Sequence, residues 1–392
     1  MKYITLIGDG MADYRIAELG NKTALQAAST PNMDFIAATG RCGVTRTIPD
    51  EMPAGSDIAI LSILGYDPRK YYTGRGPLEA LGRGVELDGK DIAFRCNLVT
   101  VSGERLVDYS AGHISSEEAR VLIEELNERL PDVEIYAGVG YRHILVLRDA
   151  FDGEIPKCTP PHDMLGENFH THLPENEALK QLILKSREIL ETHEINKKRE
   201  KEGKQKANMI WLWGGGVKPE LPSFKEKYGV HGSVISAVDL IKGIGRALGL
   251  VIVDVPGATG YLDTNYEGKA RYALKSLQRN DFVLVHVEAP DEAAHEGDVA
   301  AKIRAIEDFD EKVVGNVLAG VPDLGAARIL VMPDHYTPVS VRTHTKEPVP
   351  FAIAELPSGD EGDSVKSFDE FSARKGAFGN TPVEELMKML IC

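Results

Sequence analysis

The chain has 392 residues, 43% hydrophobic and 27% charged, so it is long enough for two or three domains and should form a globular core. Its 60 acidic residues outnumber the 45 basic ones, and the net charge of −15 argues against a nucleic acid or an anionic membrane as partner. The four cysteines, Cys42, Cys96, Cys158 and Cys392, form no Cys-x-x-Cys pair, so they predict neither a disulfide framework nor a zinc knuckle.

The first predicted element is a buried strand at residues 3–7, and the chain begins with it directly, without a signal-peptide pattern. No apolar run approaches about 18 residues, so we expect a cytoplasmic protein without a membrane span. The strand ends at Gly8-Asp9-Gly10, which places Asp9 at its tip. A dinucleotide fingerprint is disfavoured because its third glycine position falls on Asp13.

The next informative residue is Ser56, which follows a predicted helix at 23–39 and a predicted strand at 41–48. It stands after Gly55 at the start of an apolar-periodic helix. Two interpretations are open: Ser56 caps the helix by accepting a backbone N–H, or it is a nucleophile that faces the anion site at the helix N-terminus.

Residues 92–206 predict an inserted α+β domain, preceded by an ordered loop at 67–84. Short strands and helices are predicted at 92–101, 105–109, 116–129, 133–139, 142–148 and 175–193. The charged run at 196–206 is typical of a solvated hinge. The segments 1–91 and 207–392 would then form one discontinuous domain.

From residue 207 onward, predicted strands alternate with predicted helices. The strands are expected at 209–213, 251–255, 282–287, 328–332 and 350–354, and the helices at 234–248, 268–278, 299–317 and 381–390. This alternation predicts an α/β fold with a mostly parallel sheet and helices on both faces. Gly214-Gly215-Gly216 is predicted to form a tight turn, and no Gly-Lys-Ser/Thr follows it, so the chain has no P-loop.

Acidic and histidine side chains follow several predicted strands. Asp291 and His295 are four residues apart, which places both on one face of a helical turn, and Asp334, His335 and His344 follow the strand at 328–332. Each set alone is more typical of a solvated loop or an exposed helical pair than of a metal site. Together with Asp9 and Ser56 they supply seven ligands, enough for two divalent metal sites beside a serine nucleophile.

These segments resemble the archaeal-type cofactor-independent phosphoglycerate mutases, members of the alkaline phosphatase superfamily. The matching segments are Ile7–Asp13, Pro53–Asp57, Trp211–Gly214, Val255–Tyr261, Val287–His295, Pro333–His335, Thr343–His344 and Phe371–Arg374. The resemblance spans nearly the whole chain and implies an alkaline-phosphatase-like sheet with an inserted lid domain.

The resemblance also implies roles for individual residues. One metal would be held by Asp291, His295 and His344, and the other by Asp9, Ser56, Asp334 and His335. Ser56 would carry a phosphoserine intermediate, and Lys242 would lie near the phosphate. The candidates for substrate binding are Asp57, Lys242, Arg95, His113, Arg142 and His162.

The expected reaction is the interconversion of 3-phosphoglycerate and 2-phosphoglycerate, without 2,3-bisphosphoglycerate, at two divalent ions. We expect Mn²⁺, with Zn²⁺, Co²⁺ or Mg²⁺ as alternatives. The substrate would be a small phosphorylated carboxylate, and the oligomeric state is left open. Two related activities stay as alternatives, a homoserine-kinase-like phosphotransferase and a phosphomonoester hydrolase. A non-catalytic phosphometabolite-binding protein is disfavoured because no ligand position is missing.

Overall fold

Three almost continuously apolar strands lie at the centre of the largest sheet: β1 (Lys2–Gly8), β10 (Phe282–Val287) and β11 (Ala327–Met332). Such runs are typical of parallel strands covered on both faces, and β10 and β11 each pair with β1 in parallel. The computed structural model describes residues 1–357 and 362–392. It divides into a larger unit, Met1–Tyr72 with Glu220–Cys392, and a smaller unit, Thr73–Pro219.

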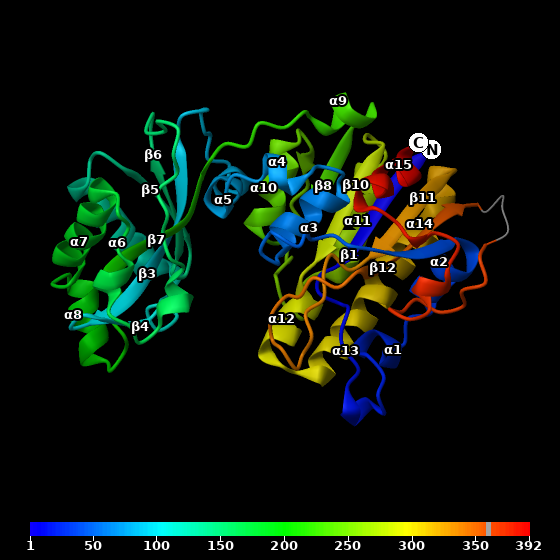
Figure 1. Ribbon diagram of the computed structural model, residues 1–392, viewed down its shortest axis with the longest axis horizontal. Helices are drawn as coiled ribbons and strands as arrows, with labels where there is room; N and C mark the ends of the chain where they lie inside the picture. The colour runs from blue at the N-terminus through cyan, green and yellow to red at the C-terminus, as the bar shows by residue number, and fades with distance from the viewer. Residues whose placement is uncertain (358–361) are drawn as a thin grey trace. The chain divides into compact units, whose positions relative to one another are not determined.

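The larger unit contains an eight-stranded sheet with the order β13-β2-β12-β11-β1-β10-β8-β9 (Figure 1). The remaining strands are β2 (Arg41–Thr45), β8 (Gly232–Ile235), β9 (Val251–Ile252), β12 (Val349–Leu356) and β13 (Gly379–Asn380). All neighbouring pairs are parallel except those of β12, which runs antiparallel to β11 and β2. The expected mostly parallel sheet is therefore confirmed.

Helices of the larger unit cover both faces of this sheet. They are α1 (Ala24–Ala27), α2 (Pro31–Thr39), α3 (Ser56–Ile63), α4 (Pro68–Tyr71), α9 (Phe224–Tyr228), α10 (Asp239–Ala247), α11 (Tyr266–Ser276), α12 (Ala289–Glu296), α13 (Val299–Asp308), α14 (Gly315–Leu324) and α15 (Leu386–Ile391). Shorter turns are η1 (Ala17–Leu19), the π-helical η4 (Phe309–Val314), η5 (Ala373–Lys375) and η6 (Val383–Glu385). The α2 and α11 helices share one apolar core with β1 and β10, whereas α10 and α15 contact the sheet outside that core.

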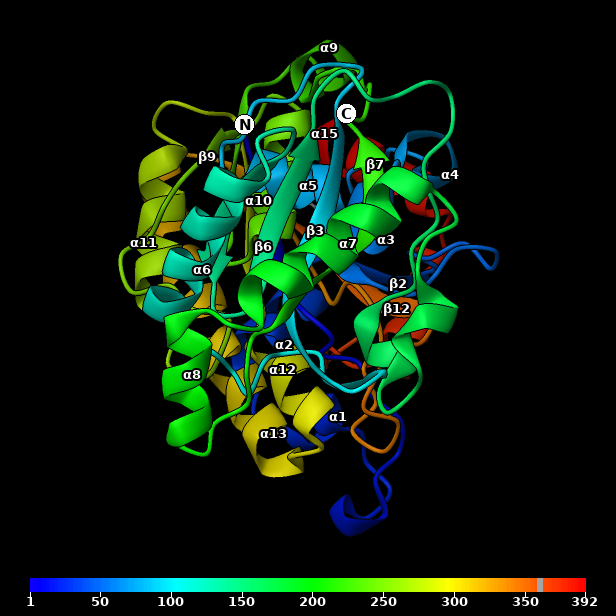
Figure 2. The ribbon, with the colours of Figure 1, turned by 90° about the vertical axis from the view of Figure 1, so that its left-hand side faces the viewer.

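The smaller unit is an α+β arrangement around β3 (Ile92–Ser102), which pairs with three other strands. Its other elements are α5 (Arg75–Gly82), β4 (Arg105–Asp108), α6 (Ser116–Arg129), β5 (Glu134–Val139), β6 (Arg142–Leu147), η2 (Pro161–Met164), η3 (Phe169–His172), α7 (Glu177–Leu190), α8 (Glu194–Lys201) and β7 (Met209–Val217). Figure 2 shows α6 and α7 lying across one face of the sheet, where their apolar side chains share its core.

Two segments predicted to be irregular are helical. Within the predicted loop at 67–84, Asp67 caps α4 with Pro68 in its first turn, and buried apolar side chains hold α5 against β3 and β7. The charged run at 196–206 is helical up to Lys201, and most of its side chains are exposed as predicted, but Arg199 is buried in α8 and donates to Glu118 and to the carbonyl of Ala111. The smaller compact unit, Thr73–Pro219, contains the residues 92–206 that were predicted to form the inserted domain.

The predicted tight turn at Gly214-Gly215-Gly216 is part of β7, which pairs with β3 as far as Val217. A Cβ at Gly215 would lie 2.3 Å from the Phe94 ring, and one at Gly216 would lie 2.2 Å from a backbone carbonyl oxygen. The glycines therefore permit close packing in a strand, a use that the sequence pattern did not distinguish from a turn. Within the described residues, every helix is too short or too polar to cross a lipid bilayer.

Candidate metal centre

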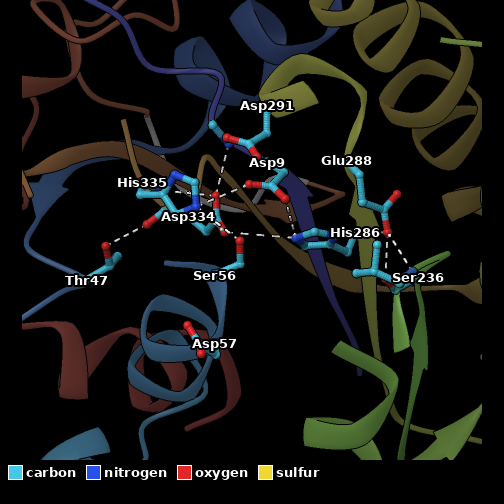
Figure 3. Close-up of polar contacts among 12 residues, drawn as sticks. Asp9, Thr47, Ser56, Asp57, Ser236, His286, Glu288, Asp291, Asp334 and His335 are labelled. Atoms are coloured by element: carbon cyan, nitrogen blue, oxygen red, sulfur yellow. Dashed lines mark hydrogen bonds and ion pairs between the residues drawn. The ribbon is translucent and has the colours of Figure 1, made fainter. Parts of the chain in front are cut away.

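Three acidic side chains lie together where three adjacent strands of the larger unit end. Asp9 follows β1, Asp334 follows β11, and Asp291 lies in the first turn of α12, directly after β10. Because β11, β1 and β10 are parallel neighbours, their carboxyl ends meet at one edge of the sheet. Figure 3 shows the three carboxylates gathered around His335. The clustering that the sequence predicted is present.

The first group consists of Asp291, His295 and His344. The Nε2 atoms of His295 and His344 are 2.9 Å apart, and they lie 3.1 and 3.4 Å from Oδ2 of Asp291. On the opposite side of each ring, Nδ1 of His295 lies 3.0 Å from the carbonyl oxygen of Arg342, and Nδ1 of His344 lies 3.4 Å from that of Ala54.

This geometry suits a cation. A carbonyl oxygen only accepts, so each Nδ1 carries a proton, and in the neutral rings that bind metal each Nε2 directs a lone pair at the other ring. Two lone pairs and a carboxylate oxygen that converge within 3.4 Å repel one another unless a positive charge lies among them. The donor set of two imidazole nitrogens and one carboxylate therefore fits a divalent metal ion.

The second group consists of Asp9, Asp334, His335 and Ser56. Nε2 of His335 lies 3.4 Å from Oδ1 of Asp9, 3.4 Å from Oδ2 of Asp334 and 3.1 Å from Oγ of Ser56. Among the described residues, Oδ1 of Asp9 and Oδ2 of Asp334 have no hydrogen-bond partner although both are buried. Burial raises the pKa of Asp9 well above its ordinary value, and the nearby carboxylates of Asp334 and Asp291 raise it further. Unpaired buried carboxylate oxygens of this kind are what a bound cation would satisfy.

Ser56 is the first residue of α3, and Gly55 occupies the capping position. The Ser56 side chain accepts no backbone N–H of the helix, and its hydroxyl is directed at His335 instead. The structure therefore disfavours the helix-cap interpretation. The next residue, Asp57, points away from the cluster in Figure 3, and its carboxylate accepts from the Tyr72 hydroxyl at 2.8 Å.

His286 belongs to this region and was missed in the sequence. Its buried ring lies at the end of β10, with Nε2 3.4 Å from Oδ2 of Asp9 and Nδ1 3.3 Å from Oε1 of Glu288. Burial lowers the pKa of His286, but the carboxylates of Asp334 and Glu288 outweigh this effect and raise the pKa to about 9. The only available signal was a histidine inside an apolar strand, which is also typical of an ordinary core residue.

Glu288, the residue that faces Nδ1 of His286, is itself held by several partners. Its Oε1 accepts from the Ser236 hydroxyl at 2.6 Å and from the backbone N–H of Ala237 at 2.9 Å, and its Oε2 accepts from Nζ of Lys269 at 2.7 Å. A buried ion pair thus holds the carboxylate that faces His286, and the ring stays directed at Asp9.

The remaining predicted residues lie elsewhere. Lys242 is on α10, where its Nζ lies 2.7 Å from Oδ1 of the exposed Asp254. Four candidates are in the smaller unit, and each lies beside one of two aromatic side chains, Tyr141 or Trp213. Arg95 and His162 lie beside Trp213, and Arg142 and His113 lie beside Tyr141.

These four residues differ in accessibility. Arg95 is buried and pairs with Glu79 at 3.1 Å, and burial lowers its pKa to about 10 although Glu79 opposes that shift. His113, Arg142 and His162 are exposed, so these three can reach a ligand without breaking a buried ion pair.

Comparisons with known proteins agree on one family. Residues 37–196 match the family model described as 2,3-bisphosphoglycerate-independent phosphoglycerate mutase. A protein with this name from Methanosarcina barkeri is 53% identical to the chain, and the alignment covers 100% of this chain and 99% of the relative. Another from Methanothrix thermoacetophila is 52% identical, and the alignment covers 100% of both proteins.

Two solved structures are also similar to the chain. A structure of the PH0037 protein from Pyrococcus horikoshii has a TM-score of 0.86 at 32% identity and covers 100% of this chain and 97% of that one. A structure of a cofactor-independent phosphoglycerate mutase from Thermoplasma acidophilum has a TM-score of 0.68 at 29% identity and covers 100% of this chain and 99% of that one.

Proposed function

The chain belongs to the 2,3-bisphosphoglycerate-independent phosphoglycerate mutases, and from this premise we propose that it interconverts 3-phosphoglycerate and 2-phosphoglycerate through a phosphoserine at Ser56. The observation that carries the proposal is the place of the Ser56 hydroxyl. It lies at the N-terminus of α3, 3.1 Å from His335, beside Asp9 and Asp334, each of which has one buried carboxylate oxygen without a hydrogen-bond partner among the described residues (Figure 3).

The two groups of candidate ligands would each hold one divalent ion. The first is Asp291, His295 and His344, and the second is Asp9, Ser56, Asp334 and His335. Mixed carboxylate and imidazole donors favour Mn²⁺, Zn²⁺ or Co²⁺, and we expect Mn²⁺. When bound, the ions would supply charge for a serine alkoxide and for the phosphoryl oxygens.

The chain's own residues then account for the transfer. The Ser56 hydroxyl loses its proton, and its oxygen forms a bond to phosphorus as the bond between phosphorus and the C3 oxygen of glycerate breaks. The C3 oxygen takes up one proton, so the protons balance. The C2 hydroxyl next attacks the phosphoserine, loses its proton, and releases Ser56 with its original hydroxyl. The serine is regenerated, so no 2,3-bisphosphoglycerate is required. Water must be excluded between the two transfers, since hydrolysis of the phosphoserine would turn the enzyme into a phosphatase.

The smaller unit would supply contacts to the glycerate part of the substrate. Arg142 is exposed and carries a planar guanidinium, which suits a carboxylate, and the exposed His113 and His162 can donate to hydroxyl groups. Arg95 would act less directly, because its guanidinium is already bound to Glu79 and stacked on Trp213.

Matched serine variants test the proposal. Ser62 lies on the same helix, is buried, and its hydroxyl has no hydrogen-bond partner among the described residues, so Ser62→Ala controls for the loss of a hydroxyl from α3. With Mn²⁺ and 3-phosphoglycerate, Ser56→Ala should lower kcat by at least about 10³-fold and keep its metal content, whereas Ser62→Ala should stay active.

Two further assays separate the related activities. Phosphate release from 3-phosphoglycerate, or phosphorylation of homoserine by ATP, is expected to be far slower than isomerisation. If either is faster, the hydrolase or the kinase-like alternative replaces the mutase.

A further inference from the structure

A buried threonine connects the two groups of candidate metal ligands. The Oγ1 atom of Thr337 lies 2.5 Å from Oδ1 of Asp291, in the first group, and 3.1 Å from Nδ1 of His335, in the second. The Thr337 side chain is fully buried, so water does not compete for these contacts.

The hydrogen-bonding capacity of each partner fixes the direction of both contacts. An ionised carboxylate only accepts, so the single hydroxyl hydrogen of Thr337 points to Asp291. Toward His335 the same oxygen must therefore accept, which places the ring proton on Nδ1. The chain of donors reads Nδ1–H of His335 to Oγ1–H of Thr337 to Oδ1 of Asp291.

This direction has consequences on both sides. With the proton on Nδ1, the Nε2 lone pair of His335 faces the Ser56 hydroxyl and the carboxylates of Asp9 and Asp334. With Oδ1 of Asp291 engaged, Oδ2 is the oxygen that faces His295 and His344. The Thr337 hydroxyl thus determines that Nε2 of His335 and Oδ2 of Asp291 are the atoms left free to bind a metal.

The Thr337 backbone is held in place independently. Its N–H donates to the carbonyl of Ala12 at 3.2 Å, and its own carbonyl accepts from the buried Nζ of Lys302 at 2.9 Å. Gly10, with φ +58°, leaves the space for this approach, because a Cβ there would lie 2.5 Å from both Oγ1 of Thr337 and Oδ1 of Asp291.

We infer that Thr337 is a positioning residue that fixes the Nδ1–H tautomer of His335 and the coordinating oxygen of Asp291, and so prepares both candidate metal sites at once. The inference rests on the proposed function, since it assumes that both groups bind metal. It predicts that loss of the hydroxyl weakens both sites together rather than one alone.

The test compares Thr337→Val with Thr337→Ser and with a matched control. Valine has the shape of threonine but leaves Nδ1–H and Oδ1 unpaired, whereas serine restores the hydroxyl. Thr45→Val is the control, because Thr45 is equally buried and its hydroxyl has no partner among the described residues.

Metal affinity, measured by competition between the full-length protein and a chelator, should fall about 10- to 100-fold at both sites in Thr337→Val. It should stay close to wild type in Thr337→Ser and Thr45→Val. Equal affinity in Thr337→Val and wild type, or weakening of a single site, would overturn the inference.

A spectroscopic measurement on the wild-type enzyme tests the tautomer without any substitution. In Zn²⁺-loaded protein labelled with ¹⁵N-histidine, the His335 ring should show a protonated Nδ1 and an unprotonated Nε2. A proton on Nε2 would refute the inference even if two ions bind. Failure of the proposed function would instead appear as fewer than two ions in the wild type.

Discussion

Replacing Lys302 with methionine should destabilise the larger unit by about 3–5 kcal/mol, because it leaves a buried carboxylate without its cation. Nζ of Lys302 lies 2.8 Å from Oδ2 of Asp13 and donates to the carbonyls of Ala12 and Thr337. Both charged side chains are buried. The ammonium group therefore joins the loop after β1 to the loop after β11, which carry candidate metal ligands.

The magnitude follows from the distance and the burial. At 2.8 Å and an effective dielectric constant of about 20, two unit charges attract by about 6 kcal/mol. The dehydration of both ions offsets much of this attraction in the native protein. Removing Lys302 alone keeps the dehydration of Asp13 and loses the attraction, and two carbonyl oxygens also lose a donor. A loss of several kcal/mol is therefore expected, even though the ion pair itself contributes little net stability.

Urea unfolding of the chelator-treated protein, followed by circular dichroism, measures the effect. Tryptophan fluorescence gives an internal reference, because both tryptophans, Trp211 and Trp213, lie in the smaller unit. The control is Lys312→Met, which removes a half-exposed partner of Asp308 and should change stability by less than about 1 kcal/mol. If Lys302→Met also changes it by less than about 1 kcal/mol, the interpretation of this buried pair is wrong.

Three other predictions concern pH, metal and substrate. Burial raises the pKa of Glu370 from 4.5 to about 7, so the native protein keeps a proton that the unfolded chain releases, and stability should fall as pH rises between those values. Glu370→Gln should flatten this dependence by up to about 3 kcal/mol in unfolding titrations at several pH values, and an unchanged slope would contradict the assignment. Chelation should lower the unfolding free energy by about 4 kcal/mol for each occupied site, relative to protein with metal at about 1,000 times its dissociation constant, and Mn²⁺ should restore it; equal melting temperatures would argue against metal binding. Arg142→Gln should raise the KM for 3-phosphoglycerate about tenfold or more with little change in stability, and the exposed Arg120→Gln should not; an unchanged KM would remove Arg142 from the substrate site.

The sequence predicted the part of the site that depends on strand ends. The strands at 3–7, 282–287 and 328–332 were visible as apolar runs, and Asp9 and Asp334 follow two of them directly. Because neighbouring parallel strands end at the same edge, these side chains had to converge once the strands paired.

The contacts that depend on pairing and packing were not predictable. His286 lies opposite Ile7 in the sheet, and only that register brings its ring to Asp9. The role of Thr337 likewise depends on a loop conformation that places one hydroxyl between Asp291 and His335. Neither residue belongs to a recognisable spacing.

Helices rich in glycine or charge were missed for a different reason. The glycines and the proline of α5 have low helix propensity, and the sequence of α8 shows no apolar face. Both helices are stabilised by contacts distant in sequence, such as that of Arg199 with Glu118. These two segments are helical because of tertiary packing, which cannot be read from the local sequence pattern.

The most direct test of the central claim is the identity of the phosphorylated residue. The Mn²⁺-loaded enzyme would be mixed briefly with 3-phosphoglycerate, quenched in acid and digested for mass spectrometry. We expect a phosphate on the peptide that contains Ser56, absent from Ser56→Ala, and 2-phosphoglycerate that carries the phosphoryl group of the substrate. Phosphate on another residue, or substantial mutase activity in Ser56→Ala, would contradict the phosphoserine mechanism.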